Sequence, residues 1–374
     1  MSIAIPVSLL TGFLGAGKTT LLNCLLKSGE LADTALIINE FGDVGIDHLL
    51  VETADEGIVE LSDGCLCCTI RGDLVDTLNR LVARNPRPAR IIIETTGLAD
   101  PAPILHAVMA HPFLSETLRL DGVITVVDAV NGMATLDGHE EAVKQVAVAD
   151  RIVVTKGDLA EETTALKTRL KSLNPMAQVL QSSDELTPSA LLECGLYDPK
   201  TKTADVSRWL ADEALNDGHR DHGHDDHDHR HNHGHHHHHG HSHHHDVNRH
   251  DARIRAFTLK TKTPIPATTL ATFVDLLRSA HGPKLLRMKG IVRIVEDEER
   301  PVVLHGVQEV FHPPATLPAW PAGPRETRMV MITRDMAEDY VQRLFKALVG
   351  DVAVDTPDKT ALEQNPLAVP GKTF

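Results

Sequence analysis

The stretch GFLGAGKT, residues 12–19, decides the fold of this 374-residue chain. It matches the pattern GxxxxGK[ST], in which backbone N–H groups of a glycine-rich turn surround phosphate oxygens at the positive end of a helix. The apolar run IPVSLL precedes it and a helical pattern follows it, which is the context that the motif requires. This context disfavours the alternative of a glycine turn without a ligand. The sequence therefore predicts a phosphate-binding loop (P-loop) between a strand and a helix.

Separate roles are expected for the positions of this loop. Lys18 is expected to meet the β- and γ-phosphates of a nucleotide and to act in catalysis, and Thr19 is expected to hold a Mg²⁺ ion. The residues expected to bind nucleotide here are Gly12, Gly15, Gly17, Lys18, Thr19 and Thr20.

Strand-like runs alternate with helical patterns through the first half of the chain. The apolar runs after the P-loop are ALIIN, RIIIETT, GVITVVDA and DRIVVTKGD. Short Val- and Ile-rich runs separated by helices indicate βαβ units and a parallel sheet buried on both faces. We therefore predict an α/β P-loop NTPase domain with a mostly parallel sheet over residues 1–215.

The remainder of the chain divides into three predicted segments. Residues 216–251 hold 17 of the 24 histidines and few apolar residues, so this segment is predicted to be a disordered linker. Strand and helix patterns resume over residues 252–348, including RAFTLK and RMVMITR, and predict a smaller α+β domain. Residues 349–374 are predicted to form a loosely held tail.

Two further motifs follow predicted strands, where they can join the P-loop. In IIIETTG, Glu94 ends an apolar run and is expected to organise Mg²⁺ and its waters, while Gly97 is placed to sense the γ-phosphate through its N–H. Both are predicted catalytic residues. The alternative for Glu94 is a surface glutamate at a strand end, which its position after a P-loop disfavours.

The motif TKGD, residues 155–158, predicts which base the nucleotide carries. A carboxylate at Asp158 accepts hydrogen bonds from N1–H and the exocyclic amine of guanine, a donor pair that adenine lacks. Lys156 is expected to lie along the base and the loop, and Thr155 completes the motif. The usual GTPase form is NKxD, so Thr155 is a departure that leaves guanine favoured rather than fixed. Ser182 and Ser183 are weaker candidates for the base pocket.

Composition narrows the class of protein. The formal net charge of −15 argues against general nucleic-acid binding, which needs clustered Lys and Arg. The N-terminus has an apolar run but lacks the basic region and cleavage site of a signal peptide, and no other run reaches the roughly 18 apolar residues of a membrane span. We therefore expect a cytoplasmic protein with reduced thiols and no nucleic-acid or membrane partner. The sequence of a single chain does not indicate the oligomeric state.

Three of the five cysteines stand within four positions, in the stretch GCLCC. Thiolates at Cys65, Cys67 and Cys68 suit Zn²⁺ or a similar ion, and three protein ligands leave a fourth position open, which suits a metal that must leave. The alternative is buried or redox-active cysteines, a description that fits Cys24 and Cys194 better. The histidines of the linker form a second and less selective class of metal site, so the linker is interpreted as a metal reservoir or loading arm. The alternative is a polar spacer without a role in metal binding.

Taken in order, GFLGAGKTT, NEFGDVGID, GCLCC, ETTG and TKGD closely resemble the CobW-type metal-chaperone GTPases. LLRMKGIVRI and VLHGVQEVF are similar to the second domain of that family. The resemblance implies GTP-driven delivery of a metal, zinc or in some members cobalt for cobalamin synthesis, to a metal-dependent client protein. It also implies that Glu40 contributes to metal binding. Asp43 and Asp47 lie in the same segment, where they are candidates to position water or Mg²⁺, with solvation of a loop as the alternative.

Three alternative functions can be compared with these motifs. The leading one is a GTPase that delivers metal, with the cofactors GTP, Mg²⁺ and Zn²⁺ or Co²⁺, because thiolate and imidazole ligands accept either ion. The second is a nucleotide-regulated metal store or sensor. The third, a P-loop kinase for a small molecule, explains neither TKGD nor the cysteine cluster.

Overall fold

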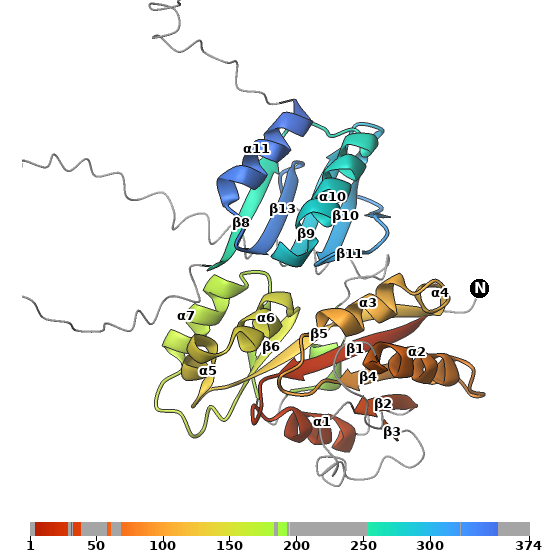
Figure 1. Cartoon of the computed structure of the whole chain (residues 1–374), viewed down its shortest axis with the longest axis vertical. Coiled ribbons are helices and arrows are strands. Elements are labelled where there is room, and N and C mark those ends of the chain that lie inside the picture. Colours follow the sequence, from red (N-terminus) through yellow and green to blue (C-terminus); the bar gives the residue numbers. More distant parts are fainter. Residues whose placement is uncertain are drawn as a thin grey trace, which may run out of the picture.

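The computed structural model has two folded parts, each built around one sheet (Figure 1). It describes residues 4–28, 31, 33–38, 58–60, 69–182, 186–192, 194, 253–321 and 323–350. The predicted segment boundaries near 215 and 252 fall at or beside residues outside these ranges, and they stay predictions.

The larger sheet confirms the predicted parallel α/β architecture. Its seven strands run in the order β3-β2-β4-β1-β5-β6-β7, and every pairing between them is parallel. Because the strands are parallel, the carboxyl ends of β1, β4, β5 and β6 meet at one edge of the sheet. The strands are β1 (Ile5–Gly12), β2 (Thr34–Ile38), β3 (Ile58–Glu60), β4 (Arg90–Glu94), β5 (Leu118–Asp128), β6 (Arg151–Thr155) and β7 (Gln178–Gln181).

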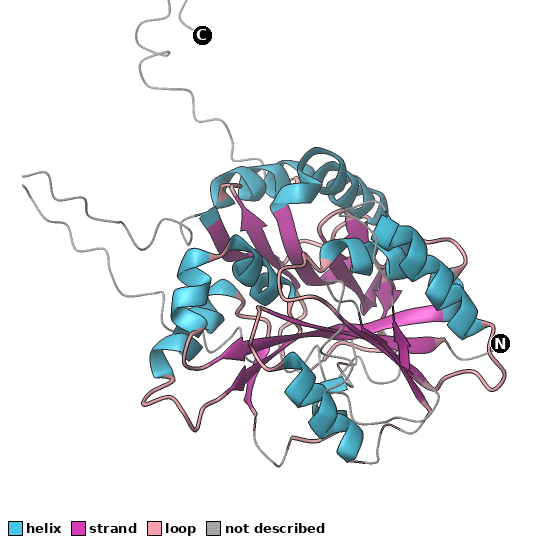
Figure 2. Ribbon diagram, turned by 60° about the horizontal axis from the view of Figure 1, so that its bottom comes forward, coloured by secondary structure: helices cyan, strands magenta, loops and turns pink. Residues whose placement is uncertain are grey.

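Helices cover both faces of this sheet (Figures 1 and 2). Neighbouring residues of β1 show the reason, since Leu9 packs with α2 and α3 whereas Leu10 packs with α1 and α8. The apolar runs are thus buried on both sides, as the sequence predicts. The helices are α1 (Lys18–Lys27), α2 (Thr69–Val82), α3 (Ala102–Ala110), α4 (Leu114–Thr117), α5 (Gly132–Gly138), α6 (Glu140–Val148), α7 (Thr164–Leu173) and α8 (Pro188–Leu192).

The smaller part is an antiparallel sheet with helices on one face, which confirms the predicted α+β class. Its main path is β11-β10-β9-β13-β8, and β12 pairs with β10. Phe273 of α10 and Phe345 of α11 pack on this sheet, with ring centroids 5.5 Å apart. The elements are β8 (Ile254–Thr261), α10 (Ala267–His281), the 3₁₀ helix η3 (Gly282–Lys284), β9 (Leu285–Ile294), β10 (Asp297–Val307), β11 (Val310–Phe311), β12 (Ala315–Thr316), β13 (Thr327–Arg334) and α11 (Glu338–Val349).

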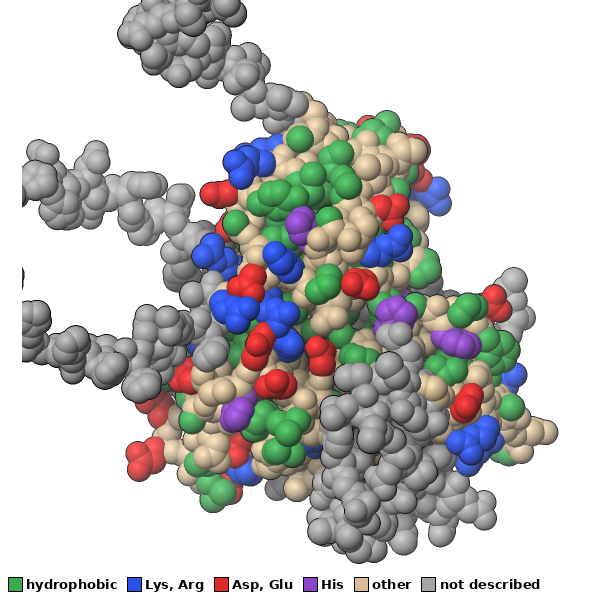
Figure 3. All heavy atoms as spheres, in the orientation of Figure 1, with side chains coloured by type: hydrophobic (Ala, Val, Ile, Leu, Met, Phe, Trp, Pro, Cys, Tyr) green, Lys and Arg blue, Asp and Glu red, His purple; other side chains and the backbone are tan. Residues whose placement is uncertain are grey.

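One buried apolar cluster contains residues of both parts. Val146 of α6 and Leu170 of α7 belong to the same buried cluster as Ile291 of β9 and Ile332 of β13. Helices α6 and α7 therefore lie between the two sheets. On the face drawn in Figure 3, acidic and basic side chains gather where the two parts meet.

None of the helices in the described ranges combines the length and the apolar character that a membrane crossing needs.

Candidate nucleotide site

The P-loop joins the end of β1 to the start of α1, as predicted. Gly12 has φ 146°, and a Cβ on it would lie 2.4 Å from the carbonyl oxygen of Val126 in β5. Only glycine allows the loop to leave the sheet so close to the neighbouring strand. Gly15 and Gly17 lie in the loop, with Gly17 at the N-cap of α1.

Lys18 folds back over this loop. Its ammonium donates to the carbonyl oxygen of Gly12 at 3.0 Å and lies 3.3 Å from that of Phe13. The charge is thus held beside the backbone N–H groups that the motif offers to phosphate. Thr20 is exposed on the first turn of α1, directly after Lys18 and Thr19 in the sequence.

The structure brings Thr19 and Glu94 together. The hydroxyl of Thr19 donates to Oε1 of Glu94 at 3.2 Å, and Glu94 is 5% exposed at the end of β4. A hydroxyl and a carboxylate beside a phosphate loop are the oxygen ligands that Mg²⁺ prefers. These two residues therefore fit a magnesium ion bound together with a nucleotide.

Gly97 lies directly against the P-loop. A Cβ on Gly97 would meet the backbone N of Leu14 at 2.6 Å and its Cα at 2.7 Å. The turn that contains Gly97 is closed by a hydrogen bond from the N–H of Ala99 to the carbonyl oxygen of Thr96 at 3.2 Å. The backbone of this turn is thus next to the backbone of the P-loop.

Two side chains of the TKGD motif donate hydrogen bonds to the backbone of the P-loop. The hydroxyl of Thr155 donates to the carbonyl oxygen of Ala16 at 2.6 Å, and the ammonium of Lys156 donates to that of Gly15 at 2.9 Å. Lys156 has φ 54°, a left-handed conformation that is uncommon for a residue with a side chain. Asp158 is exposed two residues later, and Ser182 is exposed at the end of β7.

Asp128 also belongs to this site, although it was not predicted from the sequence. It ends β5, and its Oδ2 lies 2.6 Å from the ammonium of Lys156. Burial opposes ionisation of Asp128, but hydrogen bonds from Lys156, Asn131 and the N–H of Val130 outweigh it and lower the pKa of the carboxyl. A carboxylate directly after the apolar run GVITVV, one strand before TKGD, was the available signal.

Several residues predicted to form the site lie outside the described ranges. They are the predicted metal ligands Cys65, Cys67, Cys68 and Glu40, the candidates for positioning water or Mg²⁺, Asp43 and Asp47, the base-pocket candidate Ser183, and the histidine-rich linker. Among the residues that the structure does describe, no group of three or more His, Cys, Asp or Glu side chains is placed to hold a metal ion.

The two remaining cysteines differ from each other. Cys24 is exposed on α1, whereas Cys194 is buried beside Gly122. Burial raises the pKa of the Cys194 thiol to about 12. Since the thiolate is the metal ligand and the nucleophile, Cys194 is an inert core residue.

Two family models match the chain. Residues 6–181 match the model described as CobW/HypB/UreG, nucleotide-binding domain, and residues 254–349 match that of the cobalamin synthesis protein cobW C-terminal domain.

Similar proteins match over much of the chain. The zinc chaperone YjiA of Escherichia coli (strain K12) is 30% identical over 356 residues, which cover 92% of this chain and 98% of YjiA. The zinc chaperone CobW of Sinorhizobium sp is 32% identical over 254 residues, which cover 59% of this chain and 71% of that protein. The crystal structure of Zn(II)-bound YjiA GTPase from E. coli shares the fold, with a TM-score of 0.64 at 24% identity over 93% of this chain and 99% of YjiA.

Proposed function

The chain belongs to the CobW/HypB/UreG family of nucleotide-binding proteins, and from that premise we propose that it is a GTP-hydrolysing metallochaperone that passes a divalent metal ion to a client protein. The observation that carries the proposal is the meeting of three motifs at one sheet edge. Thr19 donates a hydrogen bond to Glu94, and Gly97 lies against Leu14 of the P-loop. Lys156 donates a hydrogen bond to the carbonyl oxygen of Gly15. This is a nucleotide site with groups for the phosphates, for magnesium and for the γ-phosphate.

Each group has a role in hydrolysis. The N–H groups of the P-loop and the ammonium of Lys18 bind the β- and γ-phosphates and stabilise the negative charge that the transition state spreads over them. Thr19 and Glu94 would hold Mg²⁺, and the ion would supply positive charge that offsets the negative charge of the phosphates. The N–H of Gly97 is placed to bind the γ-phosphate, and Asp43 is proposed to orient the attacking water.

The metal is a substrate of the protein, carried and then released. Cys65, Cys67 and Cys68 are the proposed ligands, with Glu40 contributing, and their open fourth position suits transfer to a client. Zinc is the proposed ion because the similar curated proteins are named zinc chaperones or zinc-regulated activators. Cobalt handling in cobalamin biosynthesis is the second candidate, which the description of the family model at residues 254–349 favours.

The histidine-rich linker is proposed to collect metal for the cysteines. Neutral imidazoles bind several divalent ions with little discrimination, so a run of them raises the local supply without choosing the ion.

Base preference tests the nucleotide half of this proposal. We expect the unaltered chain to hydrolyse GTP in preference to ATP, with Mg²⁺ present. Asp158→Asn replaces one of the two acceptor oxygens with an NH₂ donor, which would face a guanine donor, so affinity for GTP should fall about tenfold or more. The same variant should gain affinity for xanthosine triphosphate, whose C2 oxygen accepts from the new amide. Equal use of ATP and GTP by the unaltered chain would contradict the proposal.

A further inference from the structure

Helix α6 contacts both the nucleotide site and the C-terminal sheet. His139, at its N-cap, stacks on Phe13 of the P-loop with ring centroids 4.4 Å apart. Lys144 lies 3.7 Å from Asp100, which follows the Gly97 turn. Val146 belongs to the same buried cluster as Ile291 of β9. The helix therefore links the parts of the molecule that must respond together if hydrolysis of GTP is coupled to the C-terminal domain.

The central contact of α6 is the side chain of Gln145. Its amide nitrogen donates to the carbonyl oxygens of Gly97 and Ala99, each at 3.1 Å. Gln145 is 1% exposed. Two hydrogen bonds of a buried side chain therefore hold the turn from Thr96 to Ala99, while Leu14 of the P-loop contacts Gly97 in the same turn.

The orientation of this amide is determined by its acceptors. Two carbonyl oxygens require the nitrogen on that side, since the reversed amide would place oxygen against oxygen. The Oε1 atom is buried and has no hydrogen-bond partner within the part of the chain that the structure describes. Gln145 also lines a cavity of about 210 Å³ beside the P-loop, so the amide has space to follow a displacement of the turn.

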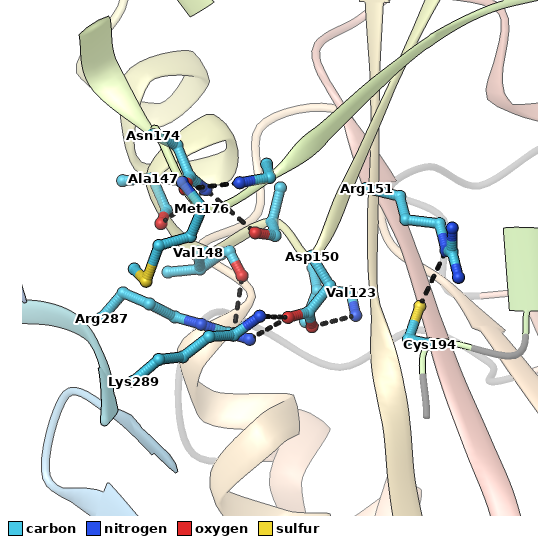
Figure 4. A network of polar contacts seen from close by, with 12 residues as sticks. Val123, Ala147, Val148, Asp150, Arg151, Asn174, Met176, Cys194, Arg287 and Lys289 are labelled. Atoms are coloured by element: carbon cyan, nitrogen blue, oxygen red, sulfur yellow. Dashed lines mark hydrogen bonds and ion pairs between the residues drawn. The ribbon is translucent and has the colours of Figure 1, made fainter. Parts of the chain in front are cut away.

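The C-terminal domain holds α6 at both ends. At the C-terminal end, Arg287 of β9 donates to the carbonyl oxygen of Val148 at 2.8 Å, and Arg287 and Lys289 both pair with Asp150 (Figure 4). At the N-terminal end, Arg334 of β13 pairs with Glu140. The second domain thus contacts both ends of the helix that carries Gln145.

We propose that Gln145 is a positioning residue for GTP hydrolysis, which holds the Gly97 turn against the P-loop, and that the C-terminal domain adjusts this position through α6. The inference rests on the proposed GTPase function. A client or metal that displaces the C-terminal sheet would then change the rate of hydrolysis without touching the nucleotide. The same link would transmit the loss of the γ-phosphate to the second domain.

The test compares Gln145→Met, which keeps the volume and removes both donors, with the unaltered full chain. Affinities for GDP and for a non-hydrolysable GTP analogue are measured by titration, and kcat and KM are measured for GTP. We expect the affinity of Gln145→Met for GDP to stay within about twofold of that of the unaltered chain, because GDP lacks the phosphate that Gly97 is proposed to face. The preference for the analogue over GDP should fall about fivefold or more. The kcat for GTP should fall about tenfold or more. Gln145→Asn, whose shorter side chain cannot reach both carbonyls, serves as the second variant where Gln145→Met does not fold.

Two further variants separate positioning from general damage. Gln342→Met makes the same chemical change on α11, where the amide donates to Glu338, and should leave every value unchanged. Arg334→Gln releases one end of α6 and should lower kcat while GDP affinity stays the same. Unchanged analogue preference and kcat in both Gln145 variants would overturn the inference. Failure of the unaltered chain to hydrolyse GTP would contradict the proposed function alone, since the preference for the analogue still tests Gln145.

Discussion

Thr155 occupies the position that is usually asparagine in GTPases, and its hydrogen bond to the P-loop gives the threonine a structural role there. The hydroxyl donates to the carbonyl oxygen of Ala16 at 2.6 Å, so it fastens the strand end to the P-loop. Recognition of the base is proposed for Asp158, which is exposed. The departure from the usual motif therefore affects a residue that supports the P-loop. It does not affect the carboxylate of Asp158, which is proposed to bind guanine.

Gly97 gives a prediction at the scale of one residue. In Gly97→Ala the new Cβ would overlap the backbone of Leu14, so the turn must move away from the P-loop. Because this displaces the N–H that is proposed to face the γ-phosphate, we expect kcat for GTP to fall about tenfold or more, with GDP affinity nearly unchanged. Steady-state kinetics and GDP titration measure both quantities.

The matched control is Gly138→Ala, since nothing lies within 4 Å of a Cβ at Gly138. It should hydrolyse GTP at the unaltered rate. A Gly97→Ala variant with unaltered kcat would show that the close approach to Leu14 has no part in hydrolysis.

At the scale of elements, the start of α1 and the end of β4 meet through Thr19 and Glu94. Glu94→Gln keeps the size of the side chain and removes its charge, which weakens attraction for Mg²⁺. We expect the Mg²⁺ concentration for half-maximal hydrolysis to rise about tenfold. A Mg²⁺ titration of the GTPase rate measures this.

Glu116→Gln is the control for that variant, because Glu116 is exposed on α4. Its Mg²⁺ requirement should equal that of the unaltered chain. The same requirement in Glu94→Gln would contradict the assignment of Glu94 to magnesium.

Local patterns predicted most elements, because each motif lies beside a strand whose apolar run is continuous. The runs IPVSLL, RIIIETT and DRIVVTKGD became β1, β4 and β6, and their parallel pairing follows from the helices between them. Gln145, Arg287 and Lys289 were not predicted. Their roles depend on contacts with residues far away in the sequence, and a polar residue in a helix or strand pattern usually indicates a solvent-facing position.

At the scale of the whole molecule, Asp150 fixes the two domains to each other. Burial opposes its ionisation, but Arg287 and Lys289 outweigh it and hold the pKa of Asp150 well below its usual range. The N–H of Val123 also donates to Asp150 at 2.9 Å, so the carboxylate joins β9 to β5. The charges contribute to folding only while Asp150 is ionised.

Asp150→Asn should therefore destabilise the protein in a pH-dependent way. Removing one partner of a buried ion pair costs about 3–5 kcal/mol at pH 7. Because the folded pKa lies below the value of 3.8 for a free aspartate, the contribution is complete above that pH and is lost as the pH falls below it toward the folded pKa. Denaturant unfolding of both proteins should give a constant difference from pH 7 to about pH 5 and a smaller one below pH 3.8.

Asp275→Asn breaks an exposed pair with Arg278 and should leave stability nearly unchanged at every pH. A loss of stability in Asp150→Asn as small as in this control would show that the pair does not hold the domains together.

Coupling between metal and nucleotide is the central claim for the whole molecule, and one measurement tests it most directly. The GTPase rate of metal-stripped protein is followed with Mg²⁺ present during separate titrations with Zn²⁺ and Co²⁺. The titrations are repeated with Cys65, Cys67 and Cys68 all changed to Ala. We predict that Zn²⁺ changes turnover at one equivalent or less and that the cysteine variant loses this response. Hydrolysis of GTP at a rate that neither ion alters would contradict the coupling of metal delivery to the nucleotide site.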